Sequence, residues 1–166
     1  MAWLHTLLRR LGYLFYRPKW LEAEGQARIE RAVSKAEGGH RGELVVLIER
    51  SVPLFSGFAQ SRQRAVEHFS TLRVWDTEAN TGVLIYLCLS ERSLEVVVDR
   101  GLDAVAPAEH WQMLCEEALE HFRAKDPLRG LEGLIERIGA DFKAFDAGQP
   151  IQDPKGNELS NQPVVI

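Results

Sequence analysis

The chain has 166 residues, a length that accommodates one domain and excludes a multidomain enzyme. Hydrophobic residues make up 45% and charged residues 27% of the sequence, which is enough apolar material for a packed core and excludes global disorder. The 20 Lys and Arg residues against 24 Asp and Glu residues give a net charge of -4. This balance lacks the basic surplus that nucleic-acid phosphates require, so we expect no nucleic-acid partner.

The amino-terminal residues 1–21 form a basic segment, which contains Arg9, Arg10, Arg17 and Lys19 and no acidic residue. A helix over residues 2–16 gathers its apolar side chains on one stripe, made of Leu4, Leu7, Leu8, Leu11, Leu14 and Phe15. Arg9 and Arg10 interrupt the apolar run, which excludes a transmembrane anchor. The charges also lie within and after the apolar residues, an order that does not fit a secretory signal peptide.

Two roles fit this amphipathic helix. The basic residues and the interfacial aromatic residues Trp3, Tyr13, Tyr16 and Trp20 suit attachment to an anionic membrane surface. The more common role of such a helix is packing against its own domain or a second copy of the chain. We expect a cytoplasmic protein with an unidentified protein partner. If residues 2–16 contact lipid, the protein is expected to lie at the inner membrane surface.

The next segments predict a strand, helix and strand after a first core helix. Helical spacing covers residues 21–37 and ends at Gly38 and Gly39, which are typical of a helix stop. The apolar runs 44–48 and 82–89 predict buried strands, and helical spacing lies between them at 58–72, starting at Phe58. Such a crossover makes the two strands parallel.

The remaining elements complete a layered domain. Residues 90–92 are a short connection to a third strand at 94–98, which predicts an antiparallel hairpin. Helices follow at 107–123 and 127–145, and Asp126 is a typical N-cap of the second. We therefore predict an α/β fold, a three-layer α/β/α sandwich whose small central sheet is mainly parallel with one antiparallel hairpin strand.

The domain is expected to span residues 22–145, and residues 146–166 to form an extended tail. The last residues of this tail, Val164, Val165 and Ile166, could dock on a sheet edge or groove. The two cysteines, Cys88 and Cys115, lie in apolar stretches outside any CxxC motif, which predicts buried free thiols. The sequence contains no GxGxxG, GxxxxGK[ST], GxSxG or HExxH motif, so we expect no nucleotide, zinc or haem cofactor.

The predicted topology brings polar loops to one edge of the sheet. A hairpin centred near Glu91 places Gly82 opposite Arg100 and Val83 opposite Asp99. Hard oxygen ligands for Ca²⁺ or Mg²⁺ then gather there, namely Asp76, Glu78, Asn80 and Asp99. Arg41 and Arg100 could bind a phosphate or carboxylate beside them.

A purely structural interpretation of these loops stays open. Asp76 and Asn80 could form turns or caps, and Asp99 and Arg100 a surface ion pair. This edge also faces away from the carboxyl ends of the parallel strands, where ligands of open α/β sheets usually bind.

The sequence resembles the TPM domain family, named for thylakoid-lumen, photosystem II repair and receptor-modulator proteins. The matching segments are HRGELVVLIE at 40–49, RVWDTEANTGVLIYLCLSERSLEVVVDRG at 73–101, HWQMLCEEALEHFR at 110–123 and the closing GNELSNQPVVI. The most specific match is the strand entry Asn-x-Gly-Val-Leu-Ile-Tyr at 80–86 followed by the strand exit Asp-Arg-Gly at 99–101, and it more closely resembles a short bacterial branch than the exported members. The chain departs from longer members because it has no evident signal peptide, carboxy-terminal membrane helix or strand before the first core helix.

The resemblance implies an α/β/α sandwich and a loop site near Asp76, Asn80 and Asp99. It also implies one of several activities that are linked to the family: acid phosphatase action, divalent-cation binding, photosystem repair or modulation of membrane proteins.

Our first hypothesis is a non-enzymatic interaction module that binds a divalent cation and associates peripherally with the membrane. The alternative is a metal-dependent phosphatase acting on phosphomonoesters, in which Asp76 and Asp99 hold the cation and Arg100 or Arg41 binds phosphate.

Overall fold

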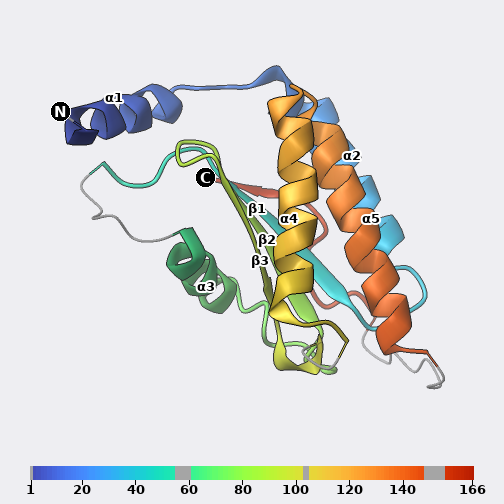
Figure 1. Ribbon diagram of the computed structural model, residues 1–166. Helices are drawn as coiled ribbons and strands as arrows, with labels where there is room; N and C mark the ends of the chain where they lie inside the picture. Colours follow the sequence, from blue (N-terminus) through green and yellow to red (C-terminus); the bar gives the residue numbers. More distant parts are fainter. Residues whose placement is uncertain (1, 55–60, 103–104, 148–155) are drawn as a thin grey trace.

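A computed structural model describes residues 2–54, 61–102, 105–147 and 156–166 (Figure 1). In chain order its elements are α1 (Ala2–Leu14), the short helix η1 (Lys19–Leu21), α2 (Ala23–Ala36), β1 (Glu43–Glu49), α3 (Ser61–Thr71), β2 (Gly82–Cys88), β3 (Ser93–Val98), η2 (Arg100–Leu102), α4 (Ala108–Arg123), α5 (Pro127–Phe145) and β4 (Val164–Val165). The predicted order of helices and strands is confirmed. Phe58 and residues 148–155 of the predicted tail lie outside the described part of the chain.

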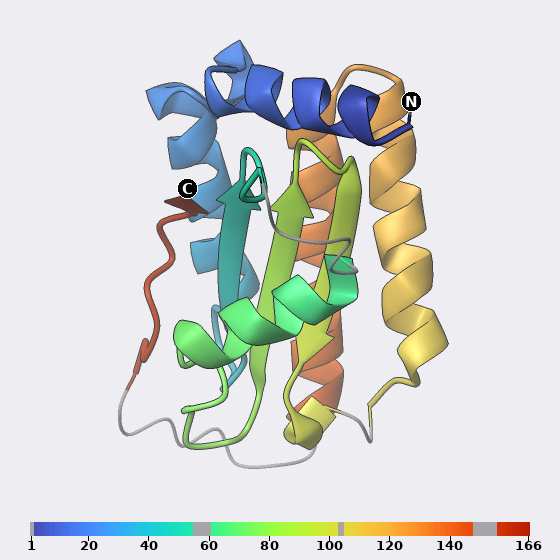
Figure 2. The ribbon, with the colours of Figure 1, turned by 90° about the vertical axis from the view of Figure 1, so that its left-hand side faces the viewer.

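The sheet has the strand order β3-β2-β1-β4. β1 pairs in parallel with β2 and with β4, and β2 pairs antiparallel with β3. Helix α3 covers one face of the sheet, and α2, α4 and α5 cover the other (Figures 1 and 2). The predicted α/β/α sandwich with a mixed sheet is therefore confirmed.

The sequence of the two central strands explains this layering. Every residue of β1 and β2 is buried, as expected for strands that are covered on both faces. Alternate side chains enter two separate cores, so that Val46 and Ile48 pack beneath α2, α4 and α5, while Val45 and Leu47 pack beneath α3. Cys88 and Cys115 are buried free thiols, as predicted.

The predicted hairpin register is wrong by one residue. The structure pairs Val83 with Val98, not with Asp99, and the Asp99 backbone N–H donates to the Gly82 carbonyl at 2.9 Å. The turn lies between the paired residues Cys88 and Ser93 and includes Arg92 at a positive φ of 52°. Because this turn contains an even number of residues, its centre falls between Ser90 and Glu91 rather than on Glu91.

The carboxy-terminal tail docks on the sheet edge, as its apolar end predicts. The Ile166 N–H donates to the Ile48 carbonyl at 3.0 Å, and the Arg50 N–H donates to the Ile166 carbonyl at 2.9 Å. Earlier in the tail, both carboxylate oxygens of Glu43 accept backbone N–H groups, from Glu158 and from Leu159, at 3.1 Å each. The tail thus adds β4 beside β1 as one edge of the sheet, and β3 forms the opposite edge.

Candidate functional site

Helix α1 lies across the carboxyl ends of β1 and β2, at one end of the sheet (Figure 2). Its hydrogen bonds with the domain come from Arg9 and Arg10. Arg9 Nη2 and Arg10 Nε donate to the two carboxylate oxygens of Glu91 at 3.1 and 3.0 Å, and the Arg10 carbonyl accepts from Ser51 Oγ at 2.9 Å. Tyr13 adds an apolar contact with the edge of the core. The domain therefore holds α1 largely through its basic face.

The opposite face of α1 is apolar and exposed. Leu4, Leu8, Leu11 and Phe15 follow one another at helical spacing and are 43–80% exposed; we call these four residues the apolar stripe. Leu14 beside the stripe is also exposed, and Leu7 is half-buried. An amphipathic helix usually packs its apolar face on its own domain, but the structure turns this one outward.

The candidate cation ligands lie at the other end of the sheet, where β1 and β2 begin. There the loop before β2 packs against the residues that follow β3: the Gly101 N–H donates to the Asn80 carbonyl at 3.0 Å, and Arg100 Nη2 donates to Asn80 Oδ1 at 3.3 Å. A Cβ at Gly101 would lie 2.3 Å from the Asn80 carbonyl, so this close approach requires glycine. The predicted convergence of Asn80, Asp99 and Arg100 is thus present.

Two other residues of the predicted site have partners of their own. Asp76 is exposed and forms an ion pair with Arg73. Arg41 binds Asp146 through its backbone N–H and its guanidinium, so its charge faces the Asp146 carboxylate. Burial alone would raise the pKa of Asp146, but these hydrogen bonds from Arg41 lower it below its usual range.

Glu78 contributes its backbone to this end of the sheet, because its N–H donates to Glu158 Oε1 at 2.9 Å. Asp99 is the candidate whose carboxylate is least engaged: its Oδ1 accepts the Arg100 N–H at 2.7 Å, while its Oδ2 is buried and has no hydrogen-bond partner in the described part of the chain. Across residues 2–54, 61–102, 105–147 and 156–166, no three His, Cys, Asp or Glu side chains group closely enough to hold a metal ion.

Sequence analysis missed a buried polar cluster beneath α3. Glu49, at the carboxyl end of β1, accepts hydrogen bonds from Arg64 Nε at 3.1 Å and from the Tyr86 hydroxyl at 2.5 Å. His68 stacks on Tyr86 and lies 3.6 Å from the Glu49 carboxylate. Burial and the neighbouring carboxylate raise the pKa of Tyr86, so its hydroxyl stays a donor. The signal in the sequence was Glu49, a glutamate that directly follows the buried apolar run 44–48.

Among the described helices, none combines the length and the apolar character that a membrane crossing requires.

Comparisons with known proteins agree with the fold. The model of the TPM domain family matches residues 17–141. The NMR structure of BA42 from the psychrophilic bacterium Bizionia argentinensis superimposes with a TM-score of 0.74 and 23% sequence identity, over 91% of this chain and 99% of that one. The N-terminal domain of a protein from P. gingivalis gives a TM-score of 0.64 and 16% identity, over 80% and 83% of the two chains.

No curated protein gives a significant match to the sequence. The two structures share the fold, and the family model covers most of the chain, from the segment after α1 to the last turns of α5. The chain therefore belongs to the TPM domain family.

Proposed function

We propose that this TPM domain is a non-enzymatic interaction module that docks on an anionic membrane surface through α1. The observation that carries the proposal is the outward apolar stripe. Six of the ten large apolar side chains exposed in the described part of the chain lie between Leu4 and Tyr16. An apolar patch of this kind on a soluble domain marks an interaction surface.

The charge distribution favours lipid as the partner of the stripe. Residues 1–21 carry four basic and no acidic residues, whereas the rest of the chain sums to -8. Arg17 and Lys19 are exposed just beyond the helix. Basic residues beside an interfacial helix are attracted to anionic headgroups, each by about 1 kcal/mol. The inner leaflet, which carries anionic lipids, is the surface that we propose.

The test is flotation of the full chain with vesicles. We expect binding to phosphatidylglycerol vesicles, weak binding to phosphatidylcholine vesicles and release by high salt. Each half-exposed leucine contributes roughly 1 kcal/mol on insertion, so the double variant Leu8→Glu, Leu11→Glu should bind at least about tenfold more weakly. Its stability should be unchanged, because both side chains are exposed.

The matched control is Val66→Glu, Met113→Glu, which places the same charges at residues of similar exposure on α3 and α4. This control should bind like the unaltered chain. Equal vesicle binding by the two double variants would contradict the proposal. A dimer that the Leu8→Glu, Leu11→Glu variant dissociates, with no vesicle binding by either form, would make the stripe a contact between two copies.

We also propose a divalent cation at the end of the sheet opposite α1, on the strength of the buried Asp99 Oδ2 that lacks a partner among the described residues. Carboxylate and amide oxygens suit Ca²⁺ or Mg²⁺. In an amide NMR titration of metal-stripped protein we expect shifts within residues 76–81 and 98–102, which Asp99→Asn removes. Asp76→Ala should weaken them less, because Asp76 already pairs with Arg73.

Absence of these shifts at millimolar cation would contradict the cation proposal. The non-enzymatic part has a separate test with p-nitrophenyl phosphate as substrate. Hydrolysis by the purified protein that Asp99→Asn abolishes would favour the phosphatase alternative instead.

A further inference from the structure

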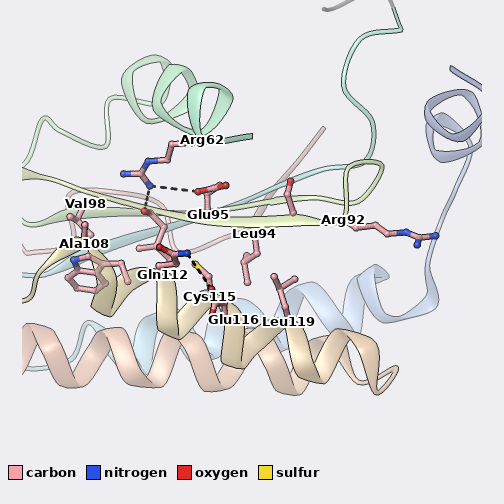
Figure 3. Close-up of a pocket in the computed structure, with 13 residues that line it drawn as sticks. Arg62, Arg92, Leu94, Glu95, Val98, Ala108, Gln112, Cys115, Glu116 and Leu119 are labelled. Atoms are coloured by element: carbon pink, nitrogen blue, oxygen red, sulfur yellow. Dashed lines mark hydrogen bonds and ion pairs between the residues drawn. The ribbon is translucent and has the colours of Figure 1, made fainter. Parts of the chain in front are cut away.

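A groove runs along the outer edge of the sheet between β3 and α4 (Figure 3). It has a volume of about 680 Å³, within the range of known ligand pockets. Leu94, Val98 and Trp111 contribute apolar surface, and Arg62 reaches over from α3 toward the strand. The lining includes none of the predicted cation ligands and no residue of α1, although Val98 directly precedes Asp99.

The backbone of β3 presents hydrogen-bonding groups to this groove. Asp99 donates its N–H to Gly82 of β2, so the neighbouring residue Val98 points its N–H and carbonyl away from β2. By the same alternation, the N–H and carbonyl groups of Val96 and Leu94 also point away from β2. An independent contact agrees, since Arg62 Nη1 donates to the Val96 carbonyl.

The middle of this edge is covered by side chains, whereas its ends are open. The Val96 carbonyl accepts a hydrogen bond from Arg62, and Cys115 of α4 lines the groove together with Val96. In the described part of the chain, no residue pairs with the outward backbone groups of Leu94 and Val98. Such an open edge is a template for another strand.

Trp111 provides a second observation that points to an occupant. This residue lines the groove and is 5% exposed, and its indole Nε1–H is buried without a hydrogen-bond partner among the described residues. Buried N–H donors in folded proteins nearly always have an acceptor. Because this nitrogen has almost no exposed surface, a carbonyl of a bound chain would reach it once the Trp111 ring turns toward the groove.

The charges indicate which chain fits. Arg92 lies at one end of the groove, far from Val98 at the other end (Figure 3), and is exposed. It forms no ion pair with any described residue, so it would attract a carboxylate. Arg62 is half-exposed, and its guanidinium lies 4.0 Å from the Glu95 carboxylate. If a bound peptide displaces Arg62 from the Val96 carbonyl, Glu95 can still pair with the Arg62 charge.

We propose that the groove binds an extended peptide segment of a partner protein, which adds to β3 as a further strand and places an acidic residue or its terminal carboxylate at Arg92. The backbone of β3 supplies affinity, and the apolar surface around Trp111 and Val98 selects the side chains. The groove uses no residue of α1, although Arg92 directly follows Glu91, which holds α1 through Arg9 and Arg10.

The test selects short random peptides, displayed on phage, against the full chain. Enriched peptides should carry β-branched residues and a carboxylate, and should shift the amide signals of residues 93–98 and the Trp111 indole. Val98→Pro removes an outward N–H at an edge position that tolerates proline, and should weaken binding by about tenfold or more.

Arg92→Glu provides a second variant that changes only an exposed side chain, and it too should weaken binding by about tenfold. The control is Arg129→Glu, at an exposed arginine near the start of α5, which should leave binding unchanged. No enrichment, or enriched peptides that bind Arg92→Glu and Arg129→Glu within about twofold of each other, would overturn the proposal. Self-association that Val98→Pro abolishes would assign the edge to a second copy and overturn the peptide partner.

Discussion

Replacing Glu49 by alanine is expected to destabilise the fold by about 3–5 kcal/mol, because it leaves a buried charge without its partner. The Glu49 side chain is 5% exposed and that of Arg64 14% exposed. Removal of the carboxylate strands the Arg64 guanidinium and the Tyr86 hydroxyl beneath α3. This loss is a large part of the about 5–15 kcal/mol that holds a typical domain together.

Urea unfolding of Glu49→Ala measures the effect. The control is Glu117→Ala, whose ion pair with Arg137 at 3.4 Å is half-exposed and is worth less than about 1 kcal/mol. The triple variant Glu49→Leu, Arg64→Met, Tyr86→Phe should recover most of the lost stability, since it removes every member of the hydrogen-bonded group. Equal midpoints for Glu49→Ala and Glu117→Ala would contradict the buried ion pair.

Local sequence patterns were enough to predict the layers of this fold. The apolar runs in β1 and β2 and the turn between β2 and β3 depend on neighbouring residues alone. The start of α5 could be predicted for the same reason, and the Asp126 side chain accepts the Arg129 N–H at 3.4 Å as an N-cap should. The one-residue error in hairpin register shows the limit, since register depends on where the turn places its left-handed residue.

Long-range contacts between charged residues could not be predicted. The apolar stripe of α1 was evident in the sequence, but its outward orientation is set by Glu91, which lies in a hairpin turn 81 residues after Arg10. Similarly, nothing local indicated that Arg41 would bind Asp146 instead of joining Arg100. The sequence therefore predicted that the loops of Asn80 and Asp99 converge, and it missed the ion pair between Arg41 and Asp146.

The burial of Glu37 is another long-range effect that could not be predicted from neighbouring residues. We expect Glu37 to make the protein less stable as pH rises. Burial raises the pKa of Glu37 to about 8, although Oε1 accepts the Leu44 N–H at 2.7 Å. The unfolded chain releases this proton near pH 4.5 and the folded chain near pH 8. Between these values the folded state binds more protons, so its stability is greatest at low pH and falls as pH rises toward 8.

The size of this fall is expected to be about 1–3 kcal/mol, because the Glu37 side chain is only partly shielded from solvent. Glu37→Gln keeps an acceptor for the Leu44 N–H without the charge. It should stabilise the protein at pH 8 by that amount and leave it nearly unchanged at pH 5.

Urea unfolding at both pH values tests this, with Glu136→Gln on the exposed face of α5 as the control. Burial lowers the pKa of His40, so this histidine reduces the stability of the folded state as pH falls below about 6.5. The His40 contribution is the same in every variant, so it cancels when each variant is compared with the unaltered chain. The charge of Glu43 contributes to the raised pKa of Glu37, and the Glu43 carboxylate also binds the tail at Glu158 and Leu159. Ionised Glu37 repels this carboxylate, so it should loosen this part of the sheet edge first. Hydrogen exchange at residues 156–166 that stays constant from pH 5 to 8, after correction for intrinsic rates, would contradict that coupling.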